Sequence, residues 1–143
     1  MNHRWLVLIA LLLAGCAGTS PSAQGTPPRP GAQLTNPASR HCVEQGGALV
    51  IERNPTGDQY GVCVFADNYQ CEEWALLRGE CRAGGIRVTG YAIPAARYCA
   101  ITGGRYAVTE RSGAPDERGT CALPAGTICD AEAYFQGTCR RGA

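Results

Sequence analysis

The sequence contains no lysine, so its 13 basic residues are all arginines, set against 12 acidic residues. Without Arg4, which lies in the N-terminal leader described below, 12 arginines balance 12 acids. Proteins that bind nucleic acid carry a basic patch or stripe, and this balance gives no sign of one. A C-x-x-C redox motif, a phosphate-binding loop, G-x-S-x-G and H-E-x-x-H are also absent. We therefore expect no nucleic-acid partner and no enzyme of these common types.

The first residues lack an apolar run of the roughly 20 residues that a membrane-spanning helix needs. The apolar run from Trp5 to Leu13 has only nine residues and follows a short basic start. Small residues then precede Cys16, a pattern that predicts a signal peptide over 1–15. It is similar to the lipobox of bacterial lipoproteins, in which the cysteine is lipidated. The alternative is a plain secretory signal with an incidental Cys16.

Lipidation of Cys16 would make the membrane a partner through the lipid anchor. The next residue is Ala17 and not aspartate, which by resemblance favours the outer membrane. We expect the protein to face the periplasm. Residues 16–35 form the lipidated cysteine and a segment of small, polar and proline residues with few large apolar side chains. Such a composition predicts a flexible tether.

An internal repeat organises the remaining chain. Cysteines separated by 21, 8 and 10 residues are followed by a second set separated by 22, 8 and 10. Other residues match at the same spacing, including Arg40 with Arg97 and Gly61 with Gly119. We interpret the residues that repeat as those the fold requires, and those that differ as free for binding. The repeat predicts four-cysteine modules at 36–81 and 93–139, a joint at 82–92 and a tail at 140–143.

Each module has the same local signals. Asn36 followed by Pro37 predicts a helix start, and the glycine pair at 46–47 predicts its end. Further elements are expected in the following order: β-rich runs at 49–53 and 59–65, a turn at 66–69, a helix at 71–78, a short strand in the joint around Ile86 and Val88, and strands at 106–110 and 120–123. The fold class is therefore α+β, with two small disulfide-stapled helix–β-hairpin–helix modules in tandem.

The eight repeated cysteines are expected to form disulfides, because modules of this size need staples and an exported protein meets an oxidising compartment. They are Cys42, Cys63, Cys71, Cys81, Cys99, Cys121, Cys129 and Cys139. Zinc is the less favoured alternative, since the nearest pair is eight residues apart and structural zinc sites use closer pairs. We expect no metal and no cofactor.

The expected helix at 71–78 also suggests a pairing. A helix would place Cys71 and Cys81 more than about 10 Å apart, beyond the Cα separation that a disulfide allows. We therefore predict Cys63–Cys71 with Cys42–Cys81. The same pairing is predicted in the second module, Cys121–Cys129 with Cys99–Cys139.

Few residues are candidates for chemistry. The mature chain has one histidine, His41, which is tyrosine in the second module, so no histidine-based mechanism repeats. An acidic group in the first module is the only candidate catalytic set: Asp67, Glu72, Glu73 and Glu80. We expect no catalytic residues. The candidate binding residues are those near the second helix of the first module: Glu72, Glu73, Trp74 and Arg78.

The strings NPASRHCVEQGG, GVCVF and CEEWALLRGEC are similar to a bacterial exported family, domain of unknown function 333, which carries a hemolysin label. GYAIPAARYCAITGG resembles the second half of its longer members. The resemblance covers nearly all of residues 36–139. It implies an exported protein, often a lipoprotein, with four cysteines in each domain and no established catalytic residues.

Four functions stay open at this level. The leading hypothesis is an outer-membrane-anchored, disulfide-stabilised binding or structural module for an envelope protein. A small inhibitor of hydrolases such as proteases or lysozyme is the alternative, with the loops at 54–58 and 111–118 as contact elements. An enzyme using the acidic set comes third, and the family label implies lytic activity as a further alternative.

Overall fold

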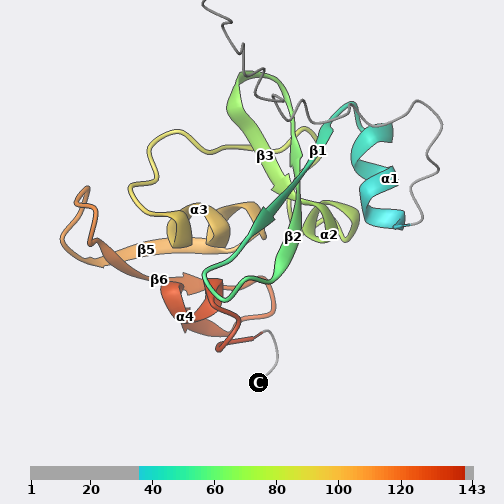
Figure 1. Cartoon of the computed structure of the whole chain (residues 1–143). Helices are drawn as coiled ribbons and strands as arrows, with labels where there is room; N and C mark the ends of the chain where they lie inside the picture. The colour runs from blue at the N-terminus through green and yellow to red at the C-terminus, as the bar shows by residue number, and fades with distance from the viewer. Residues whose placement is uncertain (1–35, 141–143) are drawn as a thin grey trace, which may run out of the picture. The chain divides into compact units, whose positions relative to one another are not determined.

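The computed structural model describes residues 36–140 (Figure 1), so the predicted signal peptide, Cys16 and tether lie outside the described residues. Both modules follow one element order, and the fold is α+β as predicted. The first module contains α1 (Pro37–Glu44), β1 (Ala48–Arg53), β2 (Gln59–Val64), the 3-10 turn η1 (Ala66–Asn68), β3 (Tyr69–Glu72) and α2 (Glu73–Leu77). After β4 (Ile86–Arg87), the second module contains α3 (Pro94–Ile101), β5 (Arg105–Glu110), β6 (Arg118–Ala122), β7 (Ile128–Asp130) and α4 (Ala131–Phe135). None of the helices in residues 36–140 is long and apolar enough to cross a membrane.

Each module builds one antiparallel sheet. The first sheet has the order β1-β2-β3-β4 and the second has the order β5-β6-β7. The registers match between the two copies, since Cys63 lies opposite Cys71 and Cys121 lies opposite Cys129. The hairpin in each module was predicted, whereas β3 and β7 were not. Sequence patterns missed these strands because they are only four and three residues long and run directly into a helix.

The first helix begins and ends where local signals predict. The side chain of Asn36 accepts a hydrogen bond from the backbone N–H of Ala38, and Pro37 occupies the first turn. At the other end, the N–H groups of Gly46 and Gly47 bond to the carbonyls of Val43 and Cys42. These contacts satisfy backbone groups that a helix leaves unpaired at its ends.

The second helix is shorter than predicted. It starts after Cys71, and the chain reverses at Gly79, which has a φ of 72°. The N–H groups of Glu80 and Cys81 both bond to the carbonyl of Ala75. Only glycine adopts this left-handed conformation without steric cost. The reversal brings Cys81 back toward Cys71 instead of carrying it to the far end of a helix.

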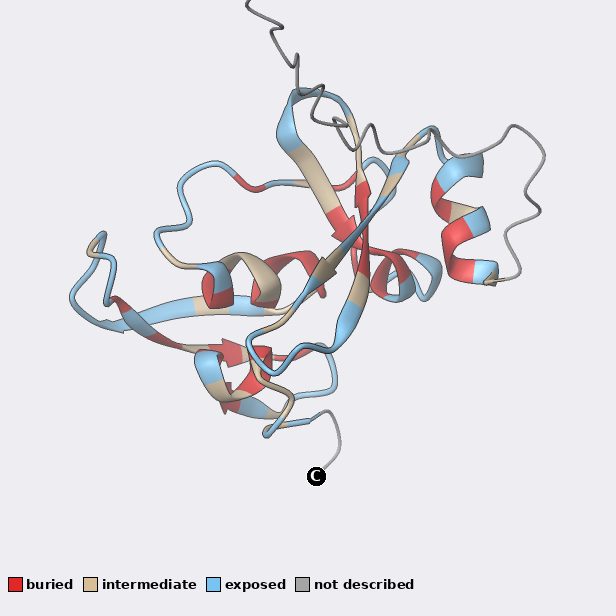
Figure 2. Ribbon diagram, in the orientation of Figure 1, coloured by how far each residue is buried: buried red, intermediate tan, exposed pale blue. Residues whose placement is uncertain are grey.

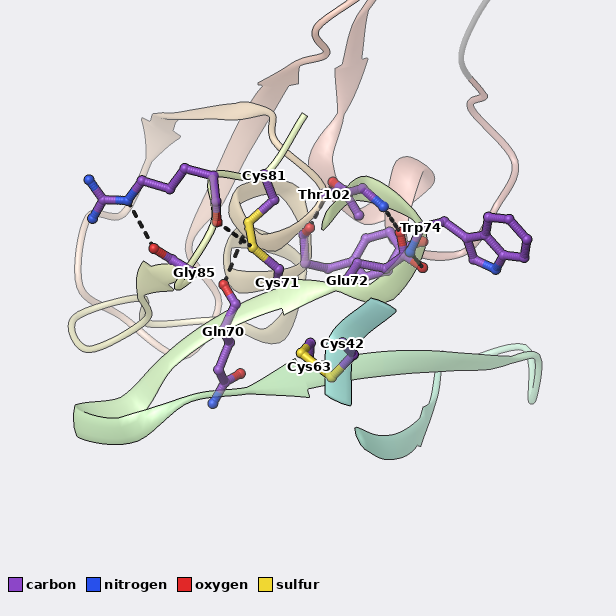
Figure 3. The surroundings of a disulfide bond; sticks show 12 residues. Cys42, Cys63, Gln70, Cys71, Glu72, Trp74, Cys81, Gly85 and Thr102 are labelled. Carbon is purple, nitrogen blue, oxygen red and sulfur yellow. Dashed lines mark hydrogen bonds between the residues drawn. A yellow bond between two sulfur atoms is a disulfide. The ribbon is translucent and has the colours of Figure 1, made fainter. Parts of the chain in front are cut away.

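The predicted disulfide pairing is therefore wrong, although all eight cysteines are paired. The bonds are Cys42–Cys63, Cys71–Cys81, Cys99–Cys121 and Cys129–Cys139, with Cα separations of 5.5, 5.9, 5.7 and 6.0 Å. Figure 3 shows the two bonds of the first module close to each other. Directly opposed residues in antiparallel strands have Cβ atoms about 4.5–5.5 Å apart, and a disulfide prefers about 3.5–4.5 Å. Cys63 and Cys71 are opposed in this way, so each forms its disulfide with a cysteine that lies outside β2 and β3.

The disulfides form the centre of each module. Cys42, Cys63, Cys71 and Cys81 are at most 2% exposed and pack with Ala75 and Leu76. The corresponding cysteines of the second module pack with Leu123 and Tyr134, although Cys139 is only partly buried. Figure 2 shows this buried material where helix meets sheet in each module. Covalent staples thus take the place of part of the large apolar core that modules of this size cannot build.

The two modules pack against each other through the predicted strand in the joint. Ile86 lies in β4, and Val88 follows it and is 8% exposed. Val88 packs with Val62 of the first module and Ile101 of the second. Tyr91, farther along the joint, is exposed and lies outside the strand. The joint therefore contributes to a shared apolar core.

An arginine from the second module also fastens the two modules together. The guanidinium of Arg97 donates two hydrogen bonds of 2.8 Å to the carboxylate of Glu52 and others to the side chain of Gln70. Tyr60 donates to the same carboxylate at 2.8 Å. The matching Arg40 makes only an exposed pair with Glu44 at 3.6 Å. The repeated arginine therefore makes different contacts in the two copies.

Candidate binding groove between the modules

The helix α2 exposes one side and buries the other. Ala75 and Leu76 face the disulfide core, whereas Trp74 is 41% exposed and Leu77 is 38% exposed. An exposed tryptophan next to an exposed leucine forms an apolar surface that a folded domain does not need for its own core. This surface borders a groove where the two modules meet.

We call this feature the junction groove, a hollow of about 590 Å³. Its lining from the first module consists of Glu72, Trp74, Arg78 and Glu80, and its lining from the second consists of Tyr98, Thr102 and Tyr134. Three of the four candidate binding residues from the sequence, Glu72, Trp74 and Arg78, are thus brought together. Figure 3 shows Glu72 and Thr102 near the disulfides, with the Trp74 ring directed away from them.

The charged groups of the groove are held by the protein itself. The Glu72 carboxylate accepts from the N–H groups of Trp74 at 3.1 Å and Ala75 at 2.8 Å, so it caps α2. Burial raises the pKa of Glu72, and the two backbone hydrogen bonds oppose that rise. Arg78 is paired with Glu80, with an Nη2–Oε2 distance of 2.9 Å. The groove therefore combines fixed, largely compensated charges with an aromatic wall.

The aromatic wall belongs to a cluster drawn from both modules. The ring of Tyr98 lies 5.2 Å from Tyr134, 5.1 Å from Phe135 and 5.1 Å from Tyr60, measured between centroids. Such pairs add stability beyond simple burial. The cluster holds Tyr98 and Tyr134 rigidly at the groove.

Sequence reasoning missed these two tyrosines, although a signal was present. Tyr98 replaces His41 and Tyr134 replaces Leu76 between the copies. Because positions that differ between the copies are free for binding in either module, the two differences indicate Tyr98 and Tyr134 as well.

Glu73, the fourth candidate, is not part of the groove. It is 5% exposed and accepts hydrogen bonds from Ser39 Oγ at 2.5 Å and from Asn36 Nδ2 at 3.0 Å. Its carboxyl group packs over Gly61, where a Cβ atom would collide with it. Glu73 therefore ties α2 to α1 in the interior of the first module.

The second module replaces this polar contact throughout. Ile93, Ala96 and Ala131 stand where Asn36, Ser39 and Glu73 stand in the first module. The space over Gly119, the counterpart of Gly61, is taken instead by the ring of Tyr106. One backbone frame thus accepts either a hydrogen-bonded or an apolar contact between its helices.

The acidic set proposed for catalysis is divided by the fold. Glu72 and Glu80 line the groove, Glu73 is buried behind α2, and Asp67 lies in η1. Within residues 36–140, no group of three or more histidine, cysteine, aspartate or glutamate side chains is placed to hold a metal ion. Of this acidic set, only Glu72 and Glu80 lie at the same groove.

Comparison with known proteins identifies relatives by sequence. A family model described as Domain of unknown function (DUF333) matches residues 33–80 and again 90–138. The protein named "Uncharacterized protein YoaF" from Escherichia coli strain K12 is 35% identical over 74 residues, which cover 52% of this chain and 84% of the relative. Proteins of the same name from Escherichia coli O6:H1 and Shigella flexneri match equally well. No solved structure matches.

Proposed function

The chain belongs to the DUF333 family, with two tandem copies of its domain, and we propose that it is a lipoprotein of the outer membrane that binds an envelope protein. In this proposal the signal peptide ends at Gly15, Cys16 carries the lipid and the two modules face the periplasm. The junction groove is the contact surface. The observation that carries the proposal is the exposure of Trp74 beside two tyrosines in one groove.

The disulfides support export. All eight cysteines of residues 36–140 are paired, and most are almost fully buried. Structural disulfides form and persist in the periplasm and other oxidising compartments, and are rare in the cytosol. A lipidated Cys16 would account for the ninth cysteine of the chain.

The composition of the groove supports binding. Tryptophan, tyrosine and arginine are the residues most enriched at the energetic centres of protein interfaces. The groove provides Trp74, Tyr98, Tyr134 and Arg78, on elements that the disulfides and the aromatic cluster hold rigid. Rigid surfaces lose little conformational entropy on binding. The proposal assigns the protein no catalytic activity.

Photo-crosslinking in intact cells tests this proposal. A photoreactive residue at Leu77, next to Trp74, is expected to capture a specific envelope protein. Trp74→Ala should reduce capture by about thirtyfold, since truncating a central interface tryptophan costs about 2 kcal/mol or more. A probe at Ile51, which is 54% exposed on β1, is the matched control. Capture of the same proteins by both probes, or capture unaffected by Trp74→Ala, contradicts the binding assignment.

The anchor requires a separate measurement. Cys16→Ser is expected to release the protein from the membrane fraction into the soluble periplasm, because the lipid would be lost. A variant that stays in the outer membrane would contradict lipidation at Cys16. This result is independent of the groove.

Inhibition of a hydrolase is a second candidate, favoured by the structure of one loop. In the loop at 54–58, the side-chain oxygen of Asn54 accepts from Thr56 Oγ1 and from the N–H of Asp58, both at 2.8 Å. The loop is exposed and internally braced, as an inhibitory loop must be to insert into a cleft. Assays against a panel of proteases and lysozyme test this function, and unchanged rates with all of them would dismiss it.

A further inference from the structure

In the first module, the side of β3 that faces away from β2 is covered by a further strand. The strand β4 pairs antiparallel with β3, with Ile86 opposite Gln70 and Arg87 opposite Tyr69. The N–H of Val88 extends the contact by bonding to the carbonyl of Asn68 at 3.2 Å. The edge of β3 therefore has a hydrogen-bonded strand along it.

The corresponding edge of the second module is open in the described structure. Within residues 36–140, β7 pairs only with β6, and no strand lies on its other side. Ile128, the counterpart of Gln70, is 69% exposed, more than any other large apolar side chain in the described residues. Unpaired edges with apolar side chains are typical sites of strand addition.

The backbone of Ile128 faces outward at this edge. The carbonyl of Thr127 accepts from the N–H of Leu123, so it points toward β6, as the carbonyl of Tyr69 points toward β2. Along a strand, successive residues direct their N–H and C=O groups to opposite sides. The polar backbone groups of Ile128 therefore point to the open side, as those of Gln70 point to β4.

We propose that the edge of β7 accepts an extended segment of a partner protein, which adds antiparallel to the second sheet as β4 adds to the first. This site is distinct from the junction groove and goes beyond the proposed function. Binding is by strand addition, with no covalent change.

The contacts that β4 makes in the first module indicate which residues that segment should contain. A Cβ atom on Gly85 would approach the backbone nitrogen of Gln70 to 2.8 Å, so a glycine is required there. Ile86 is partly buried in two apolar clusters, Arg87 is exposed, and Val88 is buried. The expected pattern is therefore glycine, then an apolar residue, a polar residue and a second apolar residue.

Ile128 strengthens this expectation. Directly opposed residues of antiparallel strands place their side chains on the same face, within contact distance. The apolar residue that corresponds to Ile86 would thus pack on Ile128. In the first module this position is Gln70, which bonds to Arg97, so the second edge is more apolar than the first.

A peptide with the sequence of residues 83–89, Ala-Gly-Gly-Ile-Arg-Val-Thr, is the probe. Titrated into the oxidised protein, it should shift the backbone amide resonances of residues 126–130 and slow hydrogen exchange at Ile128. A peptide of the same composition in scrambled order should do neither.

Two variants test the edge itself. Ile128→Pro removes the outward N–H and leaves the β6 side of β7 intact, since proline is tolerated where the N–H faces solvent. It should weaken peptide binding by at least about tenfold through the lost hydrogen bond and contact. Ile128→Lys keeps the N–H and should weaken binding through the lost apolar contact. Ile51→Lys, on the edge strand β1, should leave binding unchanged.

Four results would overturn the proposal. They are no shift at residues 126–130 with millimolar peptide, equal binding of the scrambled peptide, shifts centred on β1 or β5, and slow exchange of the Ile128 amide in the free protein. The last would mean that another part of the chain already covers the edge. Because Trp74→Ala leaves β7 untouched, failure of the groove assignment would leave these outcomes unchanged.

Discussion

The buried contact between Ser39 and Glu73 gives the sharpest test of how the first module is held together. Both side chains are at most 5% exposed, and the Ser39 hydroxyl donates to the Glu73 carboxylate at 2.5 Å. The second module has alanine at both positions, Ala96 and Ala131. We predict that removing either side chain alone lowers the free energy of unfolding by more than the energy of their contact. Removing both should lower it by less than the sum of the two single changes.

The expected magnitudes follow from the burial of the two groups. Glu73→Ala removes hydrogen bonds to a charged acceptor and leaves the Ser39 hydroxyl buried without this partner, at a cost of about 2–4 kcal/mol. Ser39→Ala removes one donor from a buried carboxylate, at a cost of about 1.5–3 kcal/mol. In the double variant no buried polar group of the pair is left over. Its cost should fall below the sum by a coupling free energy of about 1.5–3 kcal/mol.

The assay is urea-induced unfolding of the four proteins of this cycle with their disulfides intact. The free energy of unfolding is extrapolated to zero urea, and equal m-values confirm that the unfolded states are comparable. Because Asn36 is only partly buried, its amide can turn to water in Glu73→Ala, and it is left unchanged in all four proteins. Additivity within about 0.5 kcal/mol would refute the reasoning, because residues that act independently give no coupling.

The remaining predictions concern the contact of Arg97 with Glu52, which we call the clamp between the modules, and the disulfide bonds. Arg97→Ala should lower the free energy of unfolding by about 1–3 kcal/mol, because it removes a bidentate charged contact. Arg40→Ala should change it by less than about 0.5 kcal/mol, because its ion pair is exposed. Equal urea midpoints for the two variants would contradict the clamp. The hydrogen bond from Arg97 lowers the pKa of Glu52 below its ordinary value of 4.5, so this contribution is present above about pH 4.5 and is lost as the pH falls through the lowered pKa. Stability measured across this acid range should therefore fall less steeply in Glu52→Gln, and an unchanged slope would count against the pair. Opening the 10-residue Cys71–Cys81 loop by alanine at both positions should remove about 2.5–3 kcal/mol in urea unfolding. In Cys71→Ala alone, alkylation mapping should find the free thiol at Cys81, and a free thiol at any other cysteine would contradict the pairing.

Local sequence signals predicted much of the fold because their causes are local. A side-chain cap, a proline in the first turn and a glycine pair define α1 through contacts only a few residues apart. Cysteine spacing revealed the two modules and indicated that their cysteines are paired. The strands β1 and β2 followed from β-rich runs on either side of a loop rich in turn-forming residues. None of these inferences required knowledge of how distant segments pack.

The candidate site was predicted in part for the same reason. Comparison of the copies indicated Trp74 and Arg78 as free of the shared fold, and both line the junction groove. The same comparison gave no means of seeing that Glu73 turns inward, because its partners Ser39 and Asn36 are 34 and 37 residues away in the chain. Burial of a single charged side chain depends on partners that only tertiary packing supplies.

By itself, the sequence determined that the chain contains two copies of a stapled α+β module, where the first helix begins and ends, and which residues differ between the copies. Tertiary structure alone decided which cysteines bond, because a short helix and a reversal at Gly79 bring Cys81 to Cys71. It also decided that Arg97, and not Arg40, joins the modules. Identical residues at repeated positions meet different neighbours, and the neighbours, through distance and burial, give each residue its role.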